Sequence, residues 1–351
     1  MQYAILHITH LNTLVMIMNE EENGHQQVIS VGFWTLSFEF AVLCLFICSI
    51  LILWQKKDYY SIIIIASGAI FGLLLEFANV LAFGVYDYNK NFFIQVGSPP
   101  NNIPISIGLG WGLILFSVMN ITDRFEVPMQ IKILIDTLLG LSIDLSMDIV
   151  AIRLDGGFWN WHGFPVNSEI TNLSIYGVTW GNYYGWFFVI LLFSLFIRLG
   201  YKKLTDFKKF AFFGLSVPFW ASIILLGVLY IPSTVFNILI LFLDPELILF
   251  YYLNFLISIF PILLSFFFMV TYTFRTEINI KKENSLLSLF LISFIHLYFL
   301  LGLISLGIIF EIPFFALLSI NFFLITLIIE YKTINFSSSN YLNFIKSNNI
   351  D

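Results

Sequence analysis

Three aspartates in one apolar stretch of the chain are the first candidates for chemistry. Asp136, Asp144 and Asp148 fall within residues 131–154, a stretch long enough to cross a lipid bilayer as a helix. At about 100° per residue, the three side chains would occupy an arc of roughly 120°, so they share one helix face. An aspartate at the centre of a membrane helix costs roughly 2.5–3.5 kcal/mol. We therefore expect a polar cavity beside this face.

A fourth carboxyl group, that of Glu76, lies in a second apolar stretch, residues 60–84. Its predicted depth matches that of Asp144 and Asp148, so the three would form one cluster. Burial and repulsion between like charges both favour the protonated form of a carboxyl group, so one member would keep its proton and act as a general acid. The simpler alternative, which fits each group taken singly, is a buried hydrogen-bonding contact between helices.

Aromatic residues are frequent around these carboxyl groups. They are Tyr86, Tyr88, Trp111, Trp159, Trp161, Trp180, Tyr183, Tyr184 and Trp186. We expect Trp159, Trp161 and Trp180, in the Gly-rich loop after the aspartates, to form a lid over the cavity. Tyr184 and Trp186 are assigned to an aromatic belt at the membrane surface. Aromatic faces stabilise a cation by roughly 2 kcal/mol or more where water is excluded, which suits a reaction that protonates an alkene and holds the carbocation.

Composition places these residues in a membrane protein. The chain has 351 residues, of which 59% are hydrophobic and 11% charged, and its mean hydropathy is +0.91. No soluble domain can bury that much apolar surface, so we expect an all-α, polytopic bundle of about eight or nine membrane helices. A net charge of −6 without a basic patch excludes nucleic acid as a partner. The motifs of zinc proteases, serine hydrolases, P-loop enzymes and dinucleotide-binding enzymes do not occur, so no metal site or cofactor is predicted.

Hydropathy predicts where the membrane helices lie. The spans are residues 33–54, 60–84, 103–122, 131–154, 184–199, 211–231, 251–274, 286–306 and 308–331. Residues 235–250 are apolar but broken by Asp244, Pro245 and Glu246, and we interpret them as a re-entrant or interfacial hairpin. With the N-terminus outside, only Lys90 and Arg153 fall on the outer side, so the positive-inside rule predicts a multi-pass cell-membrane protein with a cytoplasmic C-terminus.

Four regions follow from these spans. Residues 1–32 are an N-terminal interfacial segment, residues 33–274 the principal membrane domain, residues 275–335 additional C-terminal membrane helices and residues 336–351 a polar tail. The C-terminal helices carry no motif and are expected only to complete the bundle. In the lid, we predict a structural ion pair between Arg153 and Asp155, and for His162 a hydrogen bond within the loop, with proton relay as the alternative.

A set of these residues resembles the carotenoid biosynthesis membrane protein family that contains the carotenoid 1,2-hydratases, including bisanhydrobacterioruberin hydratase and γ-carotene hydratase. The resemblance is carried by Glu76, Gly84, Tyr86, Tyr88, Pro104, Trp111, Asp136, Asp144, Asp148, Gly157, Trp159, Trp161 and the run YGVTWGNYYGW of residues 176–186. It covers roughly residues 33–274. Thr179 stands where the family usually has proline, and the 162–175 loop is longer than usual.

The resemblance implies addition of water to the terminal C=C bond of an acyclic carotenoid, lycopene-like or C50, without a cofactor. The partners it implies are the carotenoid and the lipid bilayer, with an association with other carotenoid-pathway enzymes left open. Our hypothesis makes Asp148 or Asp144 the acid, with Glu76 positioning water and Asp136 as the fourth catalytic candidate. The predicted substrate-binding residues are Trp111, Trp159, Trp161, Trp180, Asn182, Tyr86 and Tyr88.

Two alternative functions remain open at this stage. A membrane prenyltransferase of the lycopene-elongase type would use Asp144 and Asp148 to hold Mg²⁺ against a diphosphate, although a second Asp-rich motif is missing. A proton-coupled carrier would use the aspartate face as a relay, although acids on several helices and paired broken helices would then be expected.

Overall fold

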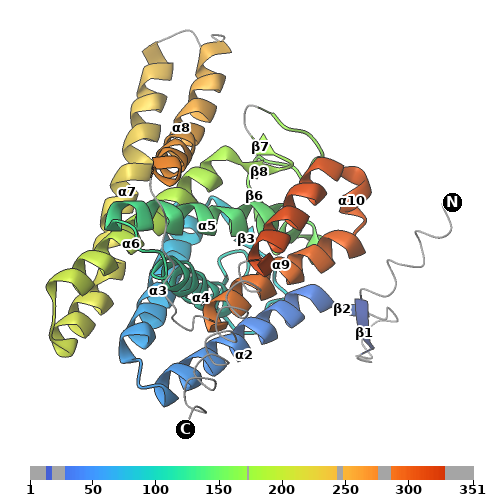
Figure 1. Ribbon diagram of the computed structural model, residues 1–351. Helices are drawn as coiled ribbons and strands as arrows, with labels where there is room; N and C mark the ends of the chain where they lie inside the picture. Colours follow the sequence, from blue (N-terminus) through green and yellow to red (C-terminus); the bar gives the residue numbers. More distant parts are fainter. Residues whose placement is uncertain (1–12, 18–27, 172–173, 243–247, 276–285, 329–351) are drawn as a thin grey trace.

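The long apolar segments form α-helices, because in lipid each backbone N–H and C=O must be bonded within its own segment. The computed structural model describes residues 13–17, 28–171, 174–242, 248–275 and 286–328 (Figure 1). Its helices are α2 (Phe33–Gln55), α3 (Tyr59–Phe77), α4 (Ile105–Thr122), α5 (Met129–Ala151), α6 (Trp180–Lys203), α7 (Phe207–Phe242), α8 (Ile248–Arg275), α9 (Leu286–Ser305) and α10 (Ile308–Glu311), with a π-helical turn η2 (Ala78–Ala82) and a 3₁₀ turn η3 (Leu154–Gly156).

The predicted all-α membrane bundle is confirmed. Among the described residues, seven helices are long and apolar enough to cross a membrane: α2, α3 with η2, α4, α6, the first part of α7, α8 and α9. Two further segments complete the predicted set. One is α5, which has 23 residues but carries the aspartates, and the other is the shorter apolar helix Pro313–Ile328.

The predicted hairpin at residues 235–250 is wrong over its first half. Helix α7 runs without a break from Phe207 to Phe242, well past the expected end at residue 231. In Figure 1 the far ends of α7 and α8 project together from the bundle as a helical hairpin. The helix-breaking residues Asp244 and Pro245 lie in residues 243–247, outside the described residues, and the apolar stretch before them simply prolongs the helix.

Short strands connect the helices. They are β1 (Thr13–Ile17), β2 (Val28–Gly32), β3 (Tyr86–Tyr88), β4 (Gln95–Val96), β5 (Ile103–Pro104), β6 (Trp159–Trp161), β7 (Ser174–Ile175) and β8 (Val178–Thr179), paired antiparallel as β1-β2, β3-β6, β4-β5 and β7-β8. The β1-β2 pair lies in the predicted interfacial segment, whose place at the membrane surface stays a prediction. The predicted polar tail, residues 336–351, lies outside the described residues.

Helix α5 lies at the centre of the bundle, in contact with α4, α6, α8 and α9 (Figure 1). The side chains of Asp136 and Asp144 have no exposed surface and that of Asp148 has 2%. Close packing supports this arrangement: a Cβ added at Gly140 would lie 2.1 Å from Cδ1 of Ile190 on α6. The expectation that the aspartates avoid lipid therefore agrees with the structure.

The lid is tied to the bundle by polar contacts other than the predicted ion pair between Arg153 and Asp155. The Asp155 carboxylate accepts hydrogen bonds from the backbone N–H of Thr35, at 2.7 Å, and from its hydroxyl group, at 3.0 Å. It thereby satisfies an otherwise free N–H in the first turn of α2. The Arg153 guanidinium instead donates to three backbone carbonyls, those of Ile149, Tyr176 and Asn167. The ion-pair prediction is wrong because Thr35 of α2 satisfies the Asp155 carboxylate and backbone carbonyls satisfy the Arg153 guanidinium.

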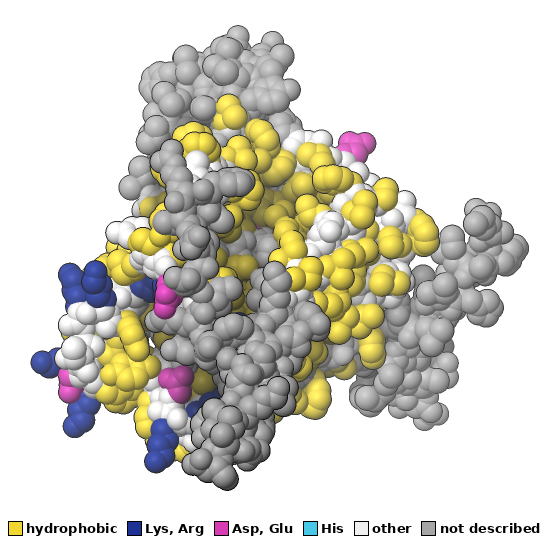
Figure 2. Space-filling view, in the orientation of Figure 1, with side chains coloured by type: hydrophobic (Ala, Val, Ile, Leu, Met, Phe, Trp, Pro, Cys, Tyr) yellow, Lys and Arg dark blue, Asp and Glu magenta, His cyan; other side chains and the backbone are white. Residues whose placement is uncertain are grey.

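Lysine and arginine side chains gather at one end of the molecule, in the lower left of Figure 2, where Figure 1 places the α2–α3 and α6–α7 connections. Lys202 and Lys203, for example, stand in the last turn of α6. This gathering agrees with the one-sided distribution on which the predicted orientation rests. The orientation itself, with the N-terminus outside, stays a prediction.

Candidate active site

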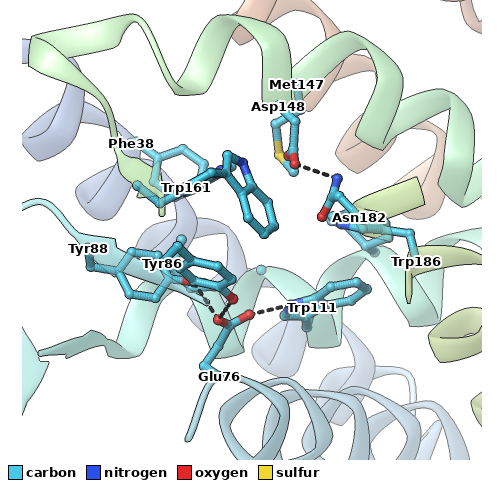
Figure 3. Close-up of a pocket in the computed structure, with 14 residues that line it drawn as sticks. Phe38, Glu76, Tyr86, Tyr88, Trp111, Met147, Asp148, Trp161, Asn182 and Trp186 are labelled. Carbon is cyan, nitrogen blue, oxygen red and sulfur yellow. Dashed lines mark hydrogen bonds between the residues drawn. The ribbon is translucent and has the colours of Figure 1, made fainter. Parts of the chain in front are cut away.

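A cavity of about 70 Å³ lies between α3, α4, α5 and α6 at the ends that face the lid (Figure 3). The residues that line it are Phe38, Glu76, Tyr86, Tyr88, Ile107, Gly110, Trp111, Ile114, Met147, Asp148, Trp159, Trp161, Asn182 and Trp186. These helices alternate in direction, so the end of α3, the start of α4, the end of α5 and the start of α6 meet. Since water occupies about 30 Å³ in the liquid, the cavity has room for about two waters or a few carbon atoms.

One wall of the cavity holds Asp148, which the side-chain amide of Asn182 joins to Asp144, a residue that is not among those lining the cavity. The Nδ2 group of Asn182 donates to Oδ2 of Asp148 at 2.7 Å (Figure 3). It also donates to Oδ1 of Asp144 at 3.0 Å. The two carboxyl groups are close enough to share a hydrogen bond when one of them carries a proton. The other oxygen of Asp148, Oδ1, is buried and accepts no hydrogen bond from the described residues. The contacts of Asp148 thus leave one of its two oxygens without a hydrogen-bond donor among the described residues.

The opposite wall holds Glu76, whose carboxylate accepts three hydrogen bonds (Figure 3). The hydroxyl groups of Tyr86 and Tyr88 donate to Oε2, the latter at 2.6 Å, and the indole N–H of Trp111 donates to Oε1 at 3.2 Å. Burial, followed by the negative charge of Glu76, raises the pKa of both phenols well above the ordinary range. Both tyrosines therefore remain O–H donors, and hydrogen bonds from three donors favour the charged form of Glu76, against the effect of burial, which disfavours it.

Indole and phenol rings enclose the space between the two walls. The rings of Trp111 and Trp186 lie 4.1 Å apart between centroids, and those of Tyr86 and Trp161 lie 4.8 Å apart at 69°. The indole N–H of Trp161 is buried and has no hydrogen-bond partner among the described residues. Together these rings form an aromatic enclosure into which Trp161 brings an unpaired N–H donor, which suits a cation or an apolar group with a bound water.

The pairing of β3 with β6 explains why residues distant in sequence meet at this cavity. Tyr86 lies opposite Trp161 and Tyr88 lies opposite Trp159 in the antiparallel register. The ribbon thus carries four of the predicted substrate-binding side chains over the cavity. This placement agrees with the lid expected for Trp159 and Trp161.

Asp136 and Trp180 lie away from this group. Asp136 accepts hydrogen bonds from Nε and Nη2 of Arg198, at 2.9 and 3.1 Å, and from the hydroxyl of Ser194 at 2.5 Å. It lies twelve residues, roughly 18 Å of helix, from Asp148. The indole N–H of Trp180 donates to the carbonyl of Thr171 at 2.9 Å, and its ring packs on Phe255. The structure therefore corrects both placements: Asp136 forms a structural ion pair, and Trp180 supports the lid from outside.

The sequence-based list missed Phe38, Met147 and Trp186, all of which line the cavity. Trp186 was assigned to the aromatic belt, yet it is 8% exposed and packs on Trp111. Its position four residues after Asn182 could have predicted that it faces the same cavity, because residues i and i+4 share a helix face. Phe38 offered no such signal, since only the packing of α2 brings it to this cavity.

Thr179, the position at which the sequence departs from the resemblance, starts α6 with a side-chain cap. Its hydroxyl accepts a hydrogen bond from the backbone N–H of Asn182 at 3.2 Å, so it acts as an N-cap. Threonine is a favoured N-cap residue and proline at this point would fix the backbone without that bond. The departure therefore keeps Asn182 in its place at the start of the helix.

The lid carries a pH-dependent contact at its outer surface, between His162 and Asp87. The two ring nitrogens of His162 face acceptors: Nδ1 lies 2.7 Å from the carbonyl of Gly84 and Nε2 lies 2.9 Å from Oδ2 of Asp87. The hydrogen bond to Asp87 and then that to Gly84 raise the pKa of the imidazole above its usual 6.5. A raised folded-state pKa contributes stability that is complete below the ordinary value and is lost as pH rises through the raised one.

We expect backbone hydrogen-exchange protection of the β3-β6 ribbon to fall as pH is raised through the pKa of His162, after correction for the intrinsic pH dependence of exchange. His162→Asn should show lower protection at acidic pH and no such step, because asparagine does not titrate. A step of the same size in His162→Asn would remove this contact as its cause.

Comparison with known proteins identifies the family of the chain. Residues 32–243 match the model of the carotenoid biosynthesis protein family, a range that contains Glu76, the aspartates and the lid. No curated protein and no solved structure has detectable similarity to the chain. The match covers more than half of the chain and agrees with its apolar helices. The chain therefore belongs to the carotenoid biosynthesis protein family and is a multi-pass membrane protein of that pathway.

Proposed function

We propose that this protein adds water to the terminal C=C bond of an acyclic carotenoid, as a cofactor-independent hydratase. The observation that carries the proposal is the buried Asp148 carboxyl group, which lines the cavity with one oxygen that accepts no hydrogen bond from the described residues. Glu76 and the indole rings lie across from it. A proton donor on one side and groups that stabilise a cation on the other match the needs of alkene protonation.

The proposed reaction has two steps. The protonated Asp148 gives its proton to the CH carbon of the terminal double bond, whose π electrons form the new C–H bond and leave the positive charge on the tertiary carbon. The oxygen of a water molecule then bonds to that carbon, and the surplus proton of the water returns to the aspartate pair. The sum is alkene plus water giving a tertiary alcohol, with no oxidant or reductant.

The supporting residues have separate roles in this scheme. Asn182 holds Asp148 and Asp144 together, so that the proton that leaves one carboxyl can be recovered by the pair. Glu76 is an anion that faces the developing cation, and its electrostatic effect is strong because the cavity is apolar and encloses little water. The tyrosines and Trp111 act as positioning residues for Glu76.

The proposal is tested by expressing the chain in a lycopene-accumulating bacterial host and analysing the extracted pigments by chromatography and mass spectrometry. A product heavier by one water molecule supports hydration. A product heavier by a five-carbon unit would instead establish prenyl transfer, which the cavity does not favour, because no lysine or arginine is among the residues that line it to bind a diphosphate. Unaltered lycopene and unaltered bisanhydrobacterioruberin, with the protein present in the membrane, would contradict the proposal.

Replacing Glu76 by glutamine should lower the hydration rate about 100-fold, since it removes the negative charge opposite the cation and turns an amide N–H₂ toward donors. The rate is measured per folded protein. The matched control is Glu39→Gln: Glu39 on α2 is also buried, but it accepts from the backbone N–H groups of Phe93 and Ile94 and does not line the cavity. Its specific rate should be unchanged, and equal losses in both variants would argue against a role for the Glu76 charge.

A further inference from the structure

A second cavity adjoins the one lined by Asp148 and Glu76, which we call the acid cavity. It has a volume of about 30 Å³ and lies between α2, α4, α5 and α9. Four of its lining residues also line the acid cavity, namely Phe38, Gly110, Ile114 and Met147. The two spaces therefore share a wall, and movement of these side chains would join them.

The walls of the second cavity are apolar. Helix α2 contributes Val42 and Leu45, and α9 contributes Leu291, Phe294, Ile295, Tyr298 and Phe299. The hydroxyl of Tyr298 is already bonded, to the carbonyl of Trp34 at 2.6 Å and to the hydroxyl of Ser37 at 2.9 Å. A molecule in this space would meet hydrocarbon and aromatic surface only.

Two features at the junction allow the spaces to join. A Cβ added at Gly110 would meet no atom within 4 Å, so the backbone of α4 leaves room there. Met147 of α5 is unbranched and flexible, and such a side chain can move aside at low cost. Outside the junction, α2 and α9 bear exposed apolar side chains, including Phe40, Ile47, Phe290 and Leu297, as expected of surfaces that face lipid.

The size of the acid cavity shows why a second space is needed. An engineered cavity of about 150 Å³ holds one benzene molecule, so a space of half that volume admits only the few reacting carbons of a long chain. A third space, of about 440 Å³, lies beside Trp159 and Trp161. It is lined largely by lid residues such as Asn160, Gly163 and Pro165. The apolar route between α2 and α9 suits a hydrocarbon chain better than the route through the lid.

We propose that the passage formed by Val42, Gly110, Met147, Phe294 and Ile295 holds the polyene chain that follows the reacting end group, and that the carotenoid reaches Asp148 from the bilayer between α2 and α9. The inference rests on the proposed function, because it assumes that the end group lies beside Asp148. It gives α9, which lies outside the 32–243 family match, a substrate-binding role. The expectation that the C-terminal helices only complete the bundle would then be too narrow.

The test compares the same substitution at two isoleucines of α9. Ile295→Trp fills the passage, whereas Ile304→Trp places the same ring on an exposed position, because Ile304 is 53% exposed and does not line the cavity. Gly110→Leu closes the junction from α4 and serves as an independent second variant. Thermal unfolding in detergent verifies that each variant is folded.

Two readouts separate this inference from the proposed function. The first is the amount of lycopene that copurifies, measured by visible absorbance, with Asp148→Asn present in every variant so that no turnover occurs. Ile295→Trp and Gly110→Leu should lower it at least about tenfold, and Ile304→Trp should leave it unchanged. The second is hydration of lycopene by the same variants with Asp148 intact, which should follow the same order.

Each outcome has a defined meaning. Lycopene binding that is equal in Ile295→Trp, Gly110→Leu and Ile304→Trp overturns the passage, whether or not the wild-type protein hydrates lycopene. Binding that is lost only in the two passage variants supports it. If the wild-type protein then yields no hydrated product, the proposed function fails while the binding passage stands.

Discussion

Replacing Asp148 by asparagine is expected to lower hydration of lycopene at least about 1,000-fold while the protein remains folded in the membrane. The asparagine side chain has nearly the same shape, and its carbonyl oxygen can still accept the 2.7 Å hydrogen bond from Nδ2 of Asn182. It cannot give a proton to an alkene. The measurement is the rate of formation of the hydrated carotenoid per folded protein, with detergent-solubilised protein quantified by size-exclusion chromatography.

The matched control for this experiment is Asp136→Asn, on the same helix. Asp136 is equally buried but binds Arg198 and Ser194 far from the cavity. This variant should yield less folded protein with an unchanged specific rate, the reverse of the result for Asp148→Asn. Unchanged product from Asp148→Asn would remove Asp148 from the mechanism and leave Asp144 as the candidate acid.

The second large effect concerns stability. Replacing Arg198 by methionine should lower the free energy of unfolding by about 3–5 kcal/mol, because it leaves the buried Asp136 carboxylate without its cation. Ser194 would still donate a hydrogen bond to this buried side chain, but a neutral hydroxyl does not replace the lost positive charge. Unfolding in mixed detergent, followed by tryptophan fluorescence, measures the change. The specific hydration rate of the folded fraction should not change.

A double variant distinguishes the loss of the pair from a general packing defect. Combining Asp136→Asn with Arg198→Met removes both charges, so it should recover much of the stability that Arg198→Met loses. Asp123→Asn tests the other partner of Arg198, which is 50% exposed, and should cost less than about 1 kcal/mol. A double variant no more stable than Arg198→Met would show that the buried charge is not the cause.

The three aspartates of α5 thus illustrate two uses of a buried carboxyl group. Near one end of the helix Asp136 is neutralised by an arginine, which completes a structural link between α5 and α6. Near the other end Asp144 and Asp148 form no ion pair within the described residues and are linked instead by the neutral amide of Asn182. The proposed function requires the second arrangement, because a carboxyl group that forms no ion pair can hold the proton that the reaction needs.

Sequence by itself determined the class of protein, because membrane helices must be long, continuous and apolar, and those properties depend only on local composition. It also identified most of the site. Eight of the predicted residues line the cavity: Glu76, Tyr86, Tyr88, Trp111, Asp148, Trp159, Trp161 and Asn182. Acidic residues are costly within membrane helices, so a cluster of them stands out from an apolar sequence.

Tertiary structure decided which of these residues act together. The periodicity of one helix places Asp136 on the same face as Asp144 and Asp148, but only packing against α6 supplies Arg198 to one and Asn182 to the others. Likewise, only the β3-β6 pairing brings the lid to the cavity, and only the position of α9 places its apolar side chains in a second cavity with Phe38 and Met147. The periodicity of a helix determines the face on which each side chain lies. Which side chain it then meets depends on contacts between segments that are far apart in the sequence.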